Sequence, residues 1–221
     1  MKCLFPGSNV VIKLITTFTL FIAYLLGLQL FINISIGKTS CIQLLAGISS
    51  IAYTTCICYS IKKLFEEKIY IRRYIQRVFN IKNGCIIVLS VLLVILVSIL
   101  VHLTSVNATS NQAEINNLLT VIPIFITIQG CIVAPIVEEV FFRKVIFNIM
   151  HPTKNTYVNN TLAIISSSIL FCMAHTPTTI NAIIIYGFAG LVLSLSYWSG
   201  NKLATSIPIH VAINIISLVT T

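Results

Sequence analysis

The sequence predicts an all-α fold, a polytopic transmembrane bundle of about seven helices, and three observations lead to this prediction. Of the 221 residues, 57% are hydrophobic and only 9% are charged, whereas soluble domains carry roughly a quarter charged residues. The mean hydropathy is +0.99. The apolar residues also gather in stretches of about 20, the length that a helix needs to cross a hydrocarbon core of ~30 Å.

Seven apolar stretches are long enough to span a membrane. They cover residues 14–36, 41–61, 84–106, 121–149, 159–175, 180–198 and 203–219. The first exceeds the apolar core of a signal peptide and lacks a small-x-small cleavage site, so we expect it to be retained. A polar loop is expected over 107–117. The chain is thus expected to be a single integral-membrane domain over 1–221, in which 1–120 supply spans and 121–219 carry the polar motifs.

The distribution of Lys and Arg predicts the orientation in the membrane. Seven of the fourteen lie between Lys62 and Lys82, and the connection at 143–157 holds three more, which places both segments in the cytoplasm. The segments 107–117 and 176–179 hold none and are expected outside. Seven spans then leave the N-terminus inside and the C-terminus outside. We attribute the net charge of +9 to contact with anionic lipid and not to nucleic acid. Composition and small size favour a prokaryotic cell membrane.

Two adjacent acids in the fourth stretch, Glu138 and Glu139, indicate function most strongly. The chain has five acidic residues, all Glu, and a carboxylate inside a bilayer costs at least ~2.5 kcal/mol. Glu139 and Arg143 are four residues apart, so they share a helix face and are expected to form a buried ion pair. Glu138 is turned about 100° away and stays free to act as a general base. The alternative is a helix-end acid pair in the headgroup region.

Three further polar residues lie in or at the ends of other apolar stretches. His175 closes the fifth stretch, and His210 and Asn214, four apart, lie on one face of the seventh. Taken singly, His175 could be an interface residue, and His210 with Asn214 could be a helix–helix hydrogen-bonding pair. Together with the buried acids, they suggest proton-transfer chemistry within the membrane.

These motifs resemble the signature of the CPBP (Abi, CAAX-protease-and-bacteriocin-processing) family of intramembrane proteases. The resemblance covers roughly 121–219 and includes the order and separation of the motifs. The motifs are Glu138-Glu139-x-x-x-Arg143, Phe171-x-x-x-His175, Gly187-x-x-Gly190 and His210-x-x-x-Asn214. The family implies an all-helical membrane fold and peptide-bond hydrolysis. Its prenyl-protein branch removes a C-terminal tripeptide after a lipidated Cys, whereas prokaryotic members are linked to bacteriocin maturation, self-immunity and peptide signalling.

The resemblance also implies a role for each matching residue. Glu138 would activate a water molecule that His175 helps to hold, and Arg143 would orient the second carboxylate of the acid pair. His210 and Asn214 would stabilise the oxyanion. These roles agree with the needs of amide hydrolysis, which are an activated water, a donor for the developing oxyanion and a proton for the leaving amine.

Other protease chemistries fit the sequence less well, and a metal remains open. The chain has no Asp for an aspartyl mechanism and no HExxH, and the nearest approach to a rhomboid-like serine motif, at 47–49, lies in an ordinary span. Glu138, His175 and His210 would form a Glu/His₂ set of the kind that binds zinc or another divalent metal. We favour a water held by protein groups alone, with no cofactor required.

The expected function is an intramembrane endopeptidase acting on small peptides or membrane-anchored proteins, of the peptide-processing or self-immunity type. The alternative is a non-catalytic immunity or scaffold protein with the same polar core; a transporter fits less well, since no inverted repeat is seen. One difficulty concerns depth, because simple placement puts Glu138 toward the inner half of the membrane and His175 near the outer end. Helix tilt, a break at Gly130 or Pro135, or a re-entrant element would be needed to bring them together.

Overall fold

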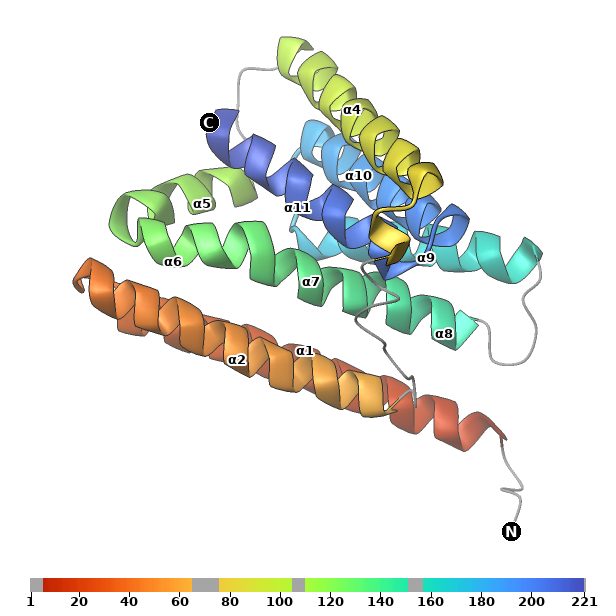
Figure 1. The fold of residues 1–221 in the computed structure, drawn as a ribbon, viewed down its shortest axis with the longest axis horizontal. Coiled ribbons are helices and arrows are strands. Elements are labelled where there is room, and N and C mark those ends of the chain that lie inside the picture. Colours follow the sequence, from red (N-terminus) through yellow and green to blue (C-terminus); the bar gives the residue numbers. More distant parts are fainter. Residues whose placement is uncertain (1–5, 65–75, 105–109, 151–156, 221) are drawn as a thin grey trace.

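The computed structural model describes residues 6–64, 76–104, 110–150 and 157–220 (Figure 1). Helices make up nearly all of these residues, and the described ranges contain no strand, so the all-α fold class is confirmed. The elements in chain order are α1 (Pro6–Ser35), α2 (Ser40–Leu64), α4 (Ile81–Thr104), α5 (Ser110–Val121), α6 (Pro123–Ile128), η1 (Gln129–Val133), α7 (Ala134–Glu138), η2 (Glu139–Val145), α8 (Ile146–Met150), α9 (Tyr157–Ala174), α10 (Ile180–Ser199) and α11 (Leu203–Thr220).

The seven expected spans are confirmed as helices of sufficient length and apolarity. They cover Ile12–Ser35, Ser40–Ile61, Ile81–Leu103, Pro123–Met150, Tyr157–Ala174, Ile180–Ser199 and Leu203–Thr220. The fourth consists of α6, η1, α7, η2 and α8 in direct succession, and we call this continuous helix over 123–150 the central rod. Its two η segments are π-helical turns, a local widening that is frequent at functional sites.

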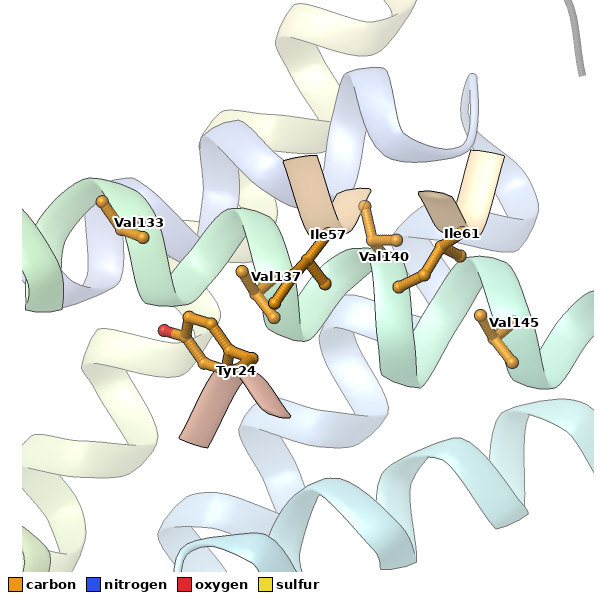
Figure 2. Close-up of a cluster of buried hydrophobic side chains, with 7 residues drawn as sticks. All are labelled: Tyr24, Ile57, Ile61, Val133, Val137, Val140 and Val145. Carbon is orange, nitrogen blue, oxygen red and sulfur yellow. The ribbon is translucent and has the colours of Figure 1, made fainter. Parts of the chain in front are cut away.

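The central rod lies between two groups of helices (Figure 1). The antiparallel pair α1 and α2 lies along one side, and α9 and α11 contact the other, with α10 and α4 packed beyond them. More of the rod is buried within the protein than of any other span. Figure 2 shows the cluster on the α1–α2 side, which comprises Tyr24, Ile57, Ile61, Val133, Val137, Val140 and Val145. The site is therefore carried by the helix that is best enclosed by others.

Serine hydroxyls connect the helices on the opposite side. The Ser90 and Ser196 hydroxyl oxygens, from α4 and α10, lie 2.8 Å apart. Ser194 of α10 donates to Ser167 of α9 at 3.0 Å, and Ser168 donates to Ser194 at 3.4 Å. Small hydroxyl residues let helices approach closely and hydrogen-bond across the contact in an apolar environment. These contacts hold α9 against α10.

One element differs from its expectation. The prediction of a loop over 107–117 is wrong in part, because residues 110–121 form the helix α5, which contacts α6. This polar segment contains apolar residues at helical spacing, Ile115, Leu118 and Leu119, and they pack against a cluster that includes Phe125 of the rod. Residues 105–109 lie outside the described part of the chain.

The charge count used for orientation also needs a correction. Arg143 and Lys144 were assigned to the connection at 143–157, but both are buried within the central rod. They belong to the span because Arg143 is paired with Glu139 and the Lys144 side chain is only 3% exposed. Residues 151–156, which include Lys154, lie outside the described residues, as do 65–75 of the basic segment. The orientation itself stays a prediction.

Candidate active site

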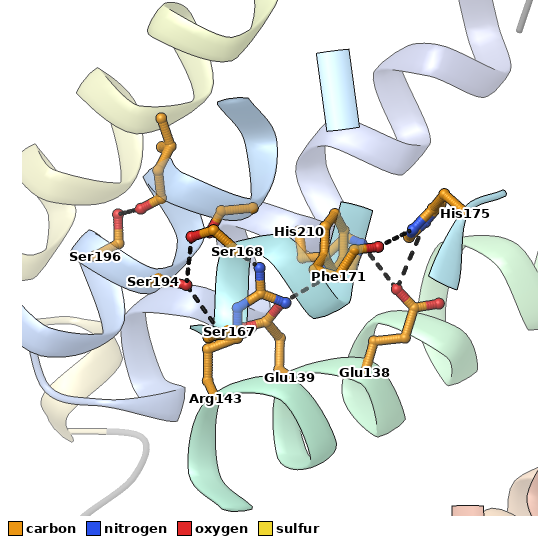
Figure 3. Close-up of polar contacts among 12 residues, drawn as sticks. Glu138, Glu139, Arg143, Ser167, Ser168, Phe171, His175, Ser194, Ser196 and His210 are labelled. Atoms are coloured by element: carbon orange, nitrogen blue, oxygen red, sulfur yellow. Dashed lines mark hydrogen bonds and ion pairs between the residues drawn. The ribbon is translucent and has the colours of Figure 1, made fainter. Parts of the chain in front are cut away.

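Five of the motif residues, from the central rod, the end of α9 and α11, converge at the middle of the central rod (Figure 3). Glu138 is the last residue of α7, and Glu139 is the first of the π-helical turn η2. His175 directly follows α9, and His210 lies within α11, two residues after Pro208. The chain therefore brings two adjacent carboxylates and two distant imidazoles to one place.

A fully buried ion pair forms the base of the site. The Arg143 guanidinium Nη1 lies 2.9 Å from Glu139 Oε1, and both side chains are 0% exposed. Arg143 Nη2 also donates to the Gly190 carbonyl oxygen at 3.3 Å, and its Cζ lies 4.4 Å from the centroid of the Phe171 ring. The spacing of four residues predicts this pair correctly. The pair keeps the Glu139 carboxylate ionised and in a fixed position, since the buried cation would otherwise be left without compensation.

His210 links the two glutamates. Its Nδ1 lies 2.9 Å from Glu139 Oε1. An ionised carboxylate can only accept, so Nδ1 carries the proton and donates it. In the neutral ring the other nitrogen, Nε2, is then an acceptor, and it lies 3.8 Å from Glu138 Oε2. Glu139 thus selects the tautomer and ring orientation of His210, in the way that a carboxylate orients a catalytic histidine.

His175 is oriented in a similar way from the other side. Its Nδ1 lies 2.8 Å from the Phe171 carbonyl oxygen, one turn earlier in the chain. A carbonyl only accepts, so Nδ1 carries the proton here too. The ring stacks on Tyr186 with centroids 4.5 Å apart, and Nε2 lies 3.8 Å from Glu138 Oε2. Two imidazole acceptors therefore face the same oxygen of Glu138, as Figure 3 shows.

The difficulty over depth is resolved without a break in the rod. The rod span has 28 residues, and Glu138 lies near its middle, whereas the α9 span has only 18. The end of the shorter helix therefore reaches the middle of the longer one. Gly130 and Pro135 both lie within continuous helix, so neither a kink nor a re-entrant segment is needed.

Asn214 contacts the central rod eight residues before Glu138. Its side-chain Nδ2 donates to the Gly130 carbonyl oxygen at 2.8 Å, in the π-helical turn η1. Asn214 shares a face of α11 with His210, as expected from the spacing of four, but this contact joins α11 to the rod and does not involve Glu138. Of the six expected site residues, five form the connected cluster in Figure 3, and Asn214 supports the rod.

The cluster also contains residues that the sequence motifs did not identify. Ser206 is fully buried one turn before His210, and its hydroxyl lies near Glu139 without full hydrogen-bond geometry. Its position four residues before His210 is the signal that could have found it. The Gly190 carbonyl is a further contact, and the Gly187-x-x-Gly190 motif gave no indication that this carbonyl accepts from Arg143.

The spacing of the acceptors bears on whether a metal fits. Among the described residues, no group of three or more His, Cys, Asp and Glu side chains has the arrangement of a metal site. Glu138 Oε2 lies 3.8 Å from each imidazole. This spacing lies between the roughly 3.4 Å that separates two ligands of a tetrahedral zinc and the roughly 4.4 Å that separates two acceptors of one water molecule. The expectation that no cofactor is required therefore stays a prediction.

Comparison with known proteins gives two matches. The family model "Type II CAAX prenyl endopeptidase Rce1-like" matches residues 120–216. The UPF0177 protein YvdC of Lactococcus lactis subsp. lactis (strain IL1403) is 29% identical over 111 residues, which is 50% of this chain and 41% of that protein. The chain thus matches less than half the length of this relative. No solved structure matches the chain.

Proposed function

We propose that the chain, whose residues 120–216 match the family model of Rce1-like type II CAAX prenyl endopeptidases, is an intramembrane peptidase in which Glu138 activates a water molecule. The observation that carries this proposal is the convergence of three acceptors, Glu138 Oε2 and the Nε2 atoms of His175 and His210. A water held among these acceptors donates its two protons to Glu138 and to one of the imidazoles, and this leaves its oxygen lone pairs for attack on a carbonyl carbon.

The proposed reaction has two steps. Glu138 takes a proton from the water as the water oxygen forms a bond to the carbonyl carbon, and the carbonyl electron pair moves to the oxygen. The resulting tetrahedral intermediate then collapses, the carbon–nitrogen bond breaks, and the proton on Glu138 passes to the leaving amine. No net charge is created by the cycle, and Glu138 ends in its starting state.

Glu139 and Arg143 act through His210 and not on the substrate. Their ion pair fixes the His210 ring, whose Nδ1 is 2.9 Å from Glu139 Oε1. Because both charged groups are fully buried, they keep one arrangement throughout the reaction, which is the preorganisation that electrostatic catalysis requires.

The depth of the site supports a membrane-associated substrate. Glu138 lies near the middle of a 28-residue span, so a scissile bond must enter the hydrocarbon region to reach it. A peptide with apolar residues or a lipid anchor next to the cleavage site can do so, whereas a free polar peptide pays for its desolvation. We therefore propose lipidated or apolar membrane peptides as the substrate class, with bacteriocin-type peptide processing or self-immunity as the setting.

The test is cleavage of defined peptides by the purified protein in lipid nanodiscs. The probes are internally quenched peptides that end in Cys-aliphatic-aliphatic-X, with and without a prenyl group on the Cys. We expect Glu138→Gln to lower kcat by at least ~100-fold, since a general base contributes about 10²–10⁴. Glu114→Gln, the same change on the exposed face of α5, is the matched control and should keep full activity.

Two further outcomes are informative. Activity that survives a chelator would support water held by protein groups, whereas loss restored by zinc would favour the Glu/His₂ metal set. If wild-type protein in nanodiscs cleaves none of the probes and immunity or signalling in cells survives Glu138→Gln, the non-catalytic membrane partner is the better description.

A further inference from the structure

The N-terminal helix α1 reaches the rod directly beside the catalytic carboxylate. Phe21 of α1 stacks on Phe141 of the rod, with ring centroids 4.1 Å apart and planes at 16°. Tyr24, about one turn further along α1, packs with Val133 and Val137 (Figure 2). Val137 immediately precedes Glu138. The helix that the motifs assign only to the membrane is thus in contact with the site's own segment.

The Tyr24 side chain is buried with its hydroxyl unused. It is 3% exposed, and its hydroxyl has no hydrogen-bond partner among the described residues. Tyr53, in α2, makes the contrast clear, because its hydroxyl donates to the Ala23 carbonyl oxygen at 2.6 Å. Tyr24 lies near the middle of the Ile12–Ser35 span, where lipid offers no donor or acceptor. A buried tyrosine usually finds a partner for its hydroxyl, so this group is available to a ligand.

Glu138 lies within electrostatic range of this phenol. Glu138 Oε2 also accepts no hydrogen bond from the described residues, and the two imidazole nitrogens that face it are acceptors. Two groups of the motif residues have partners away from Glu138: Asn214 Nδ2 donates to the Gly130 carbonyl and Arg143 Nη2 to the Gly190 carbonyl. Arg143 Nε has no partner among the described residues, but it belongs to the fully buried ion pair. The arrangement around Glu138 thus supplies a base, and the Tyr24 hydroxyl is an unused donor near it for the oxygen that becomes negative during amide hydrolysis.

We propose that the Tyr24 hydroxyl is a further catalytic group, which donates a hydrogen bond to the substrate carbonyl oxygen as it becomes an oxyanion. This inference rests on the proposed peptidase function. While the water oxygen bonds to the carbonyl carbon and Glu138 takes the water proton, the carbonyl π pair moves to the oxygen, which accepts from Tyr24 O–H. The phenol keeps its proton throughout, and the hydrogen bond weakens again when the carbonyl re-forms and the carbon–nitrogen bond breaks.

The experiment compares Tyr24→Phe with Tyr53→Phe, two changes that remove one buried hydroxyl each and keep the ring. Both proteins are measured in lipid nanodiscs for thermal unfolding and for kcat and KM on the prenylated quenched peptide. We expect Tyr24→Phe to lower kcat by roughly 10²–10³, the effect of losing one oxyanion donor, with KM within about twofold. Its Tm should be equal to or above that of the wild type, because no hydrogen bond of the folded protein is lost. Tyr53→Phe should lower Tm and leave kcat nearly unchanged.

Two results would overturn the inference. An unchanged kcat in Tyr24→Phe would show that the hydroxyl does not act on the reacting oxygen. A Tm as low as that of Tyr53→Phe would show that the hydroxyl has a structural partner. The proposed function fails separately, because its failure is a wild-type protein that cleaves no probe, whereas failure of the inference is an active wild type with an equally active Tyr24→Phe variant.

Discussion

Glu138 and Glu139 are neighbours in the chain with opposite surroundings. Glu139 is fully buried, with Arg143 and His210 on the same carboxylate oxygen. Glu138 has a side chain that is 20% exposed, and its nearest ionisable neighbours are two imidazole nitrogens at 3.8 Å. One step along a helix turns a side chain by about 100°, and this is enough to separate the carboxylate of the buried ion pair from the one that we propose as the base.

This contrast predicts opposite effects of the same substitution on stability. Glu139→Gln leaves the Arg143 guanidinium buried without its counter-charge, and breaking a buried pair in this way costs about 3–5 kcal/mol. Glu138→Gln removes a charge that has no such pair, so its unfolding free energy should stay within roughly 0.5 kcal/mol of the wild type. Thermal unfolding of both variants in nanodiscs, followed by the fluorescence of Trp198, measures the difference. Equal stability of the two variants would contradict the assignment of Glu139 as the anchoring carboxylate.

At the scale of elements, the contact between α9 and α10 sets the position of the guanidinium. A Cβ added to Gly190 would lie 3.0 Å from the Ser168 carbonyl oxygen and 3.2 Å from a ring carbon of Phe171. The same residue accepts from Arg143, and the Phe171 ring lies under that side chain. The close approach of two helices and the placement of the buried cation therefore depend on one residue without a side chain.

Alanine substitutions at the two glycines of the Gly187-x-x-Gly190 motif are predicted to have very different effects on stability and activity. Gly190→Ala must push α9 and α10 apart by a few tenths of an ångström, so we expect a loss of about 1–3 kcal/mol together with reduced peptidase activity. Gly187→Ala is the matched control, because its new Cβ would meet only the Cys172 Sγ at 3.9 Å, an ordinary contact. Thermal unfolding and kcat of both variants test this. A Gly190→Ala protein as stable and active as Gly187→Ala would refute the role given to this close contact.

The elements also show why some features could be predicted from the sequence. The long apolar stretches predicted the spans correctly, because a helix needs about 20 apolar residues to cross a hydrocarbon core, whatever its tertiary contacts are. The helix α5 was not predicted, because the three apolar residues that pack against the cluster around Phe125, Ile115, Leu118 and Leu119, lie in a segment rich in Asn and Gln. The π-helical turns beside Glu138 have no such local signal, because tertiary packing decides where a helix widens.

For the site, the order of the motifs identified the residues but not all of their contacts. The Glu139–Arg143 pair follows from local spacing, and its geometry agrees. The spacing of four places Asn214 on the same face as His210 but did not indicate that its amide contacts the Gly130 carbonyl, since such a spacing fixes a helix face and not the partner across it. Tyr24 and Ser206 have no charge or motif to mark them, and their relevance appears only when α1 and α11 lie against the rod.

For the molecule as a whole, the arrangement in the membrane depends on fewer charges than the sequence indicated. Arg143 is fully buried and Lys144 nearly so, within the central rod, so neither lies in a loop. The basic segment Lys62–Lys82, with seven of the fourteen Lys and Arg residues, then carries most of the orientation signal. Each Lys or Arg close to anionic lipid contributes about 1 kcal/mol, so this one segment is sufficient to hold the protein in a single orientation.

We therefore predict a cytoplasmic N-terminus and an external C-terminus. Fused after residue 221, alkaline phosphatase should be active and green fluorescent protein dark, because the first matures only outside the cytoplasm and the second only inside. Green fluorescent protein before residue 1 should be bright. Replacing the seven Lys and Arg of Lys62–Lys82 with Gln removes the main retention signal, so a mixed population with both reporters partly active is expected. A bright C-terminal fusion would contradict the orientation, and two bright fusions on the unaltered chain would mean that an even number of helices crosses the membrane.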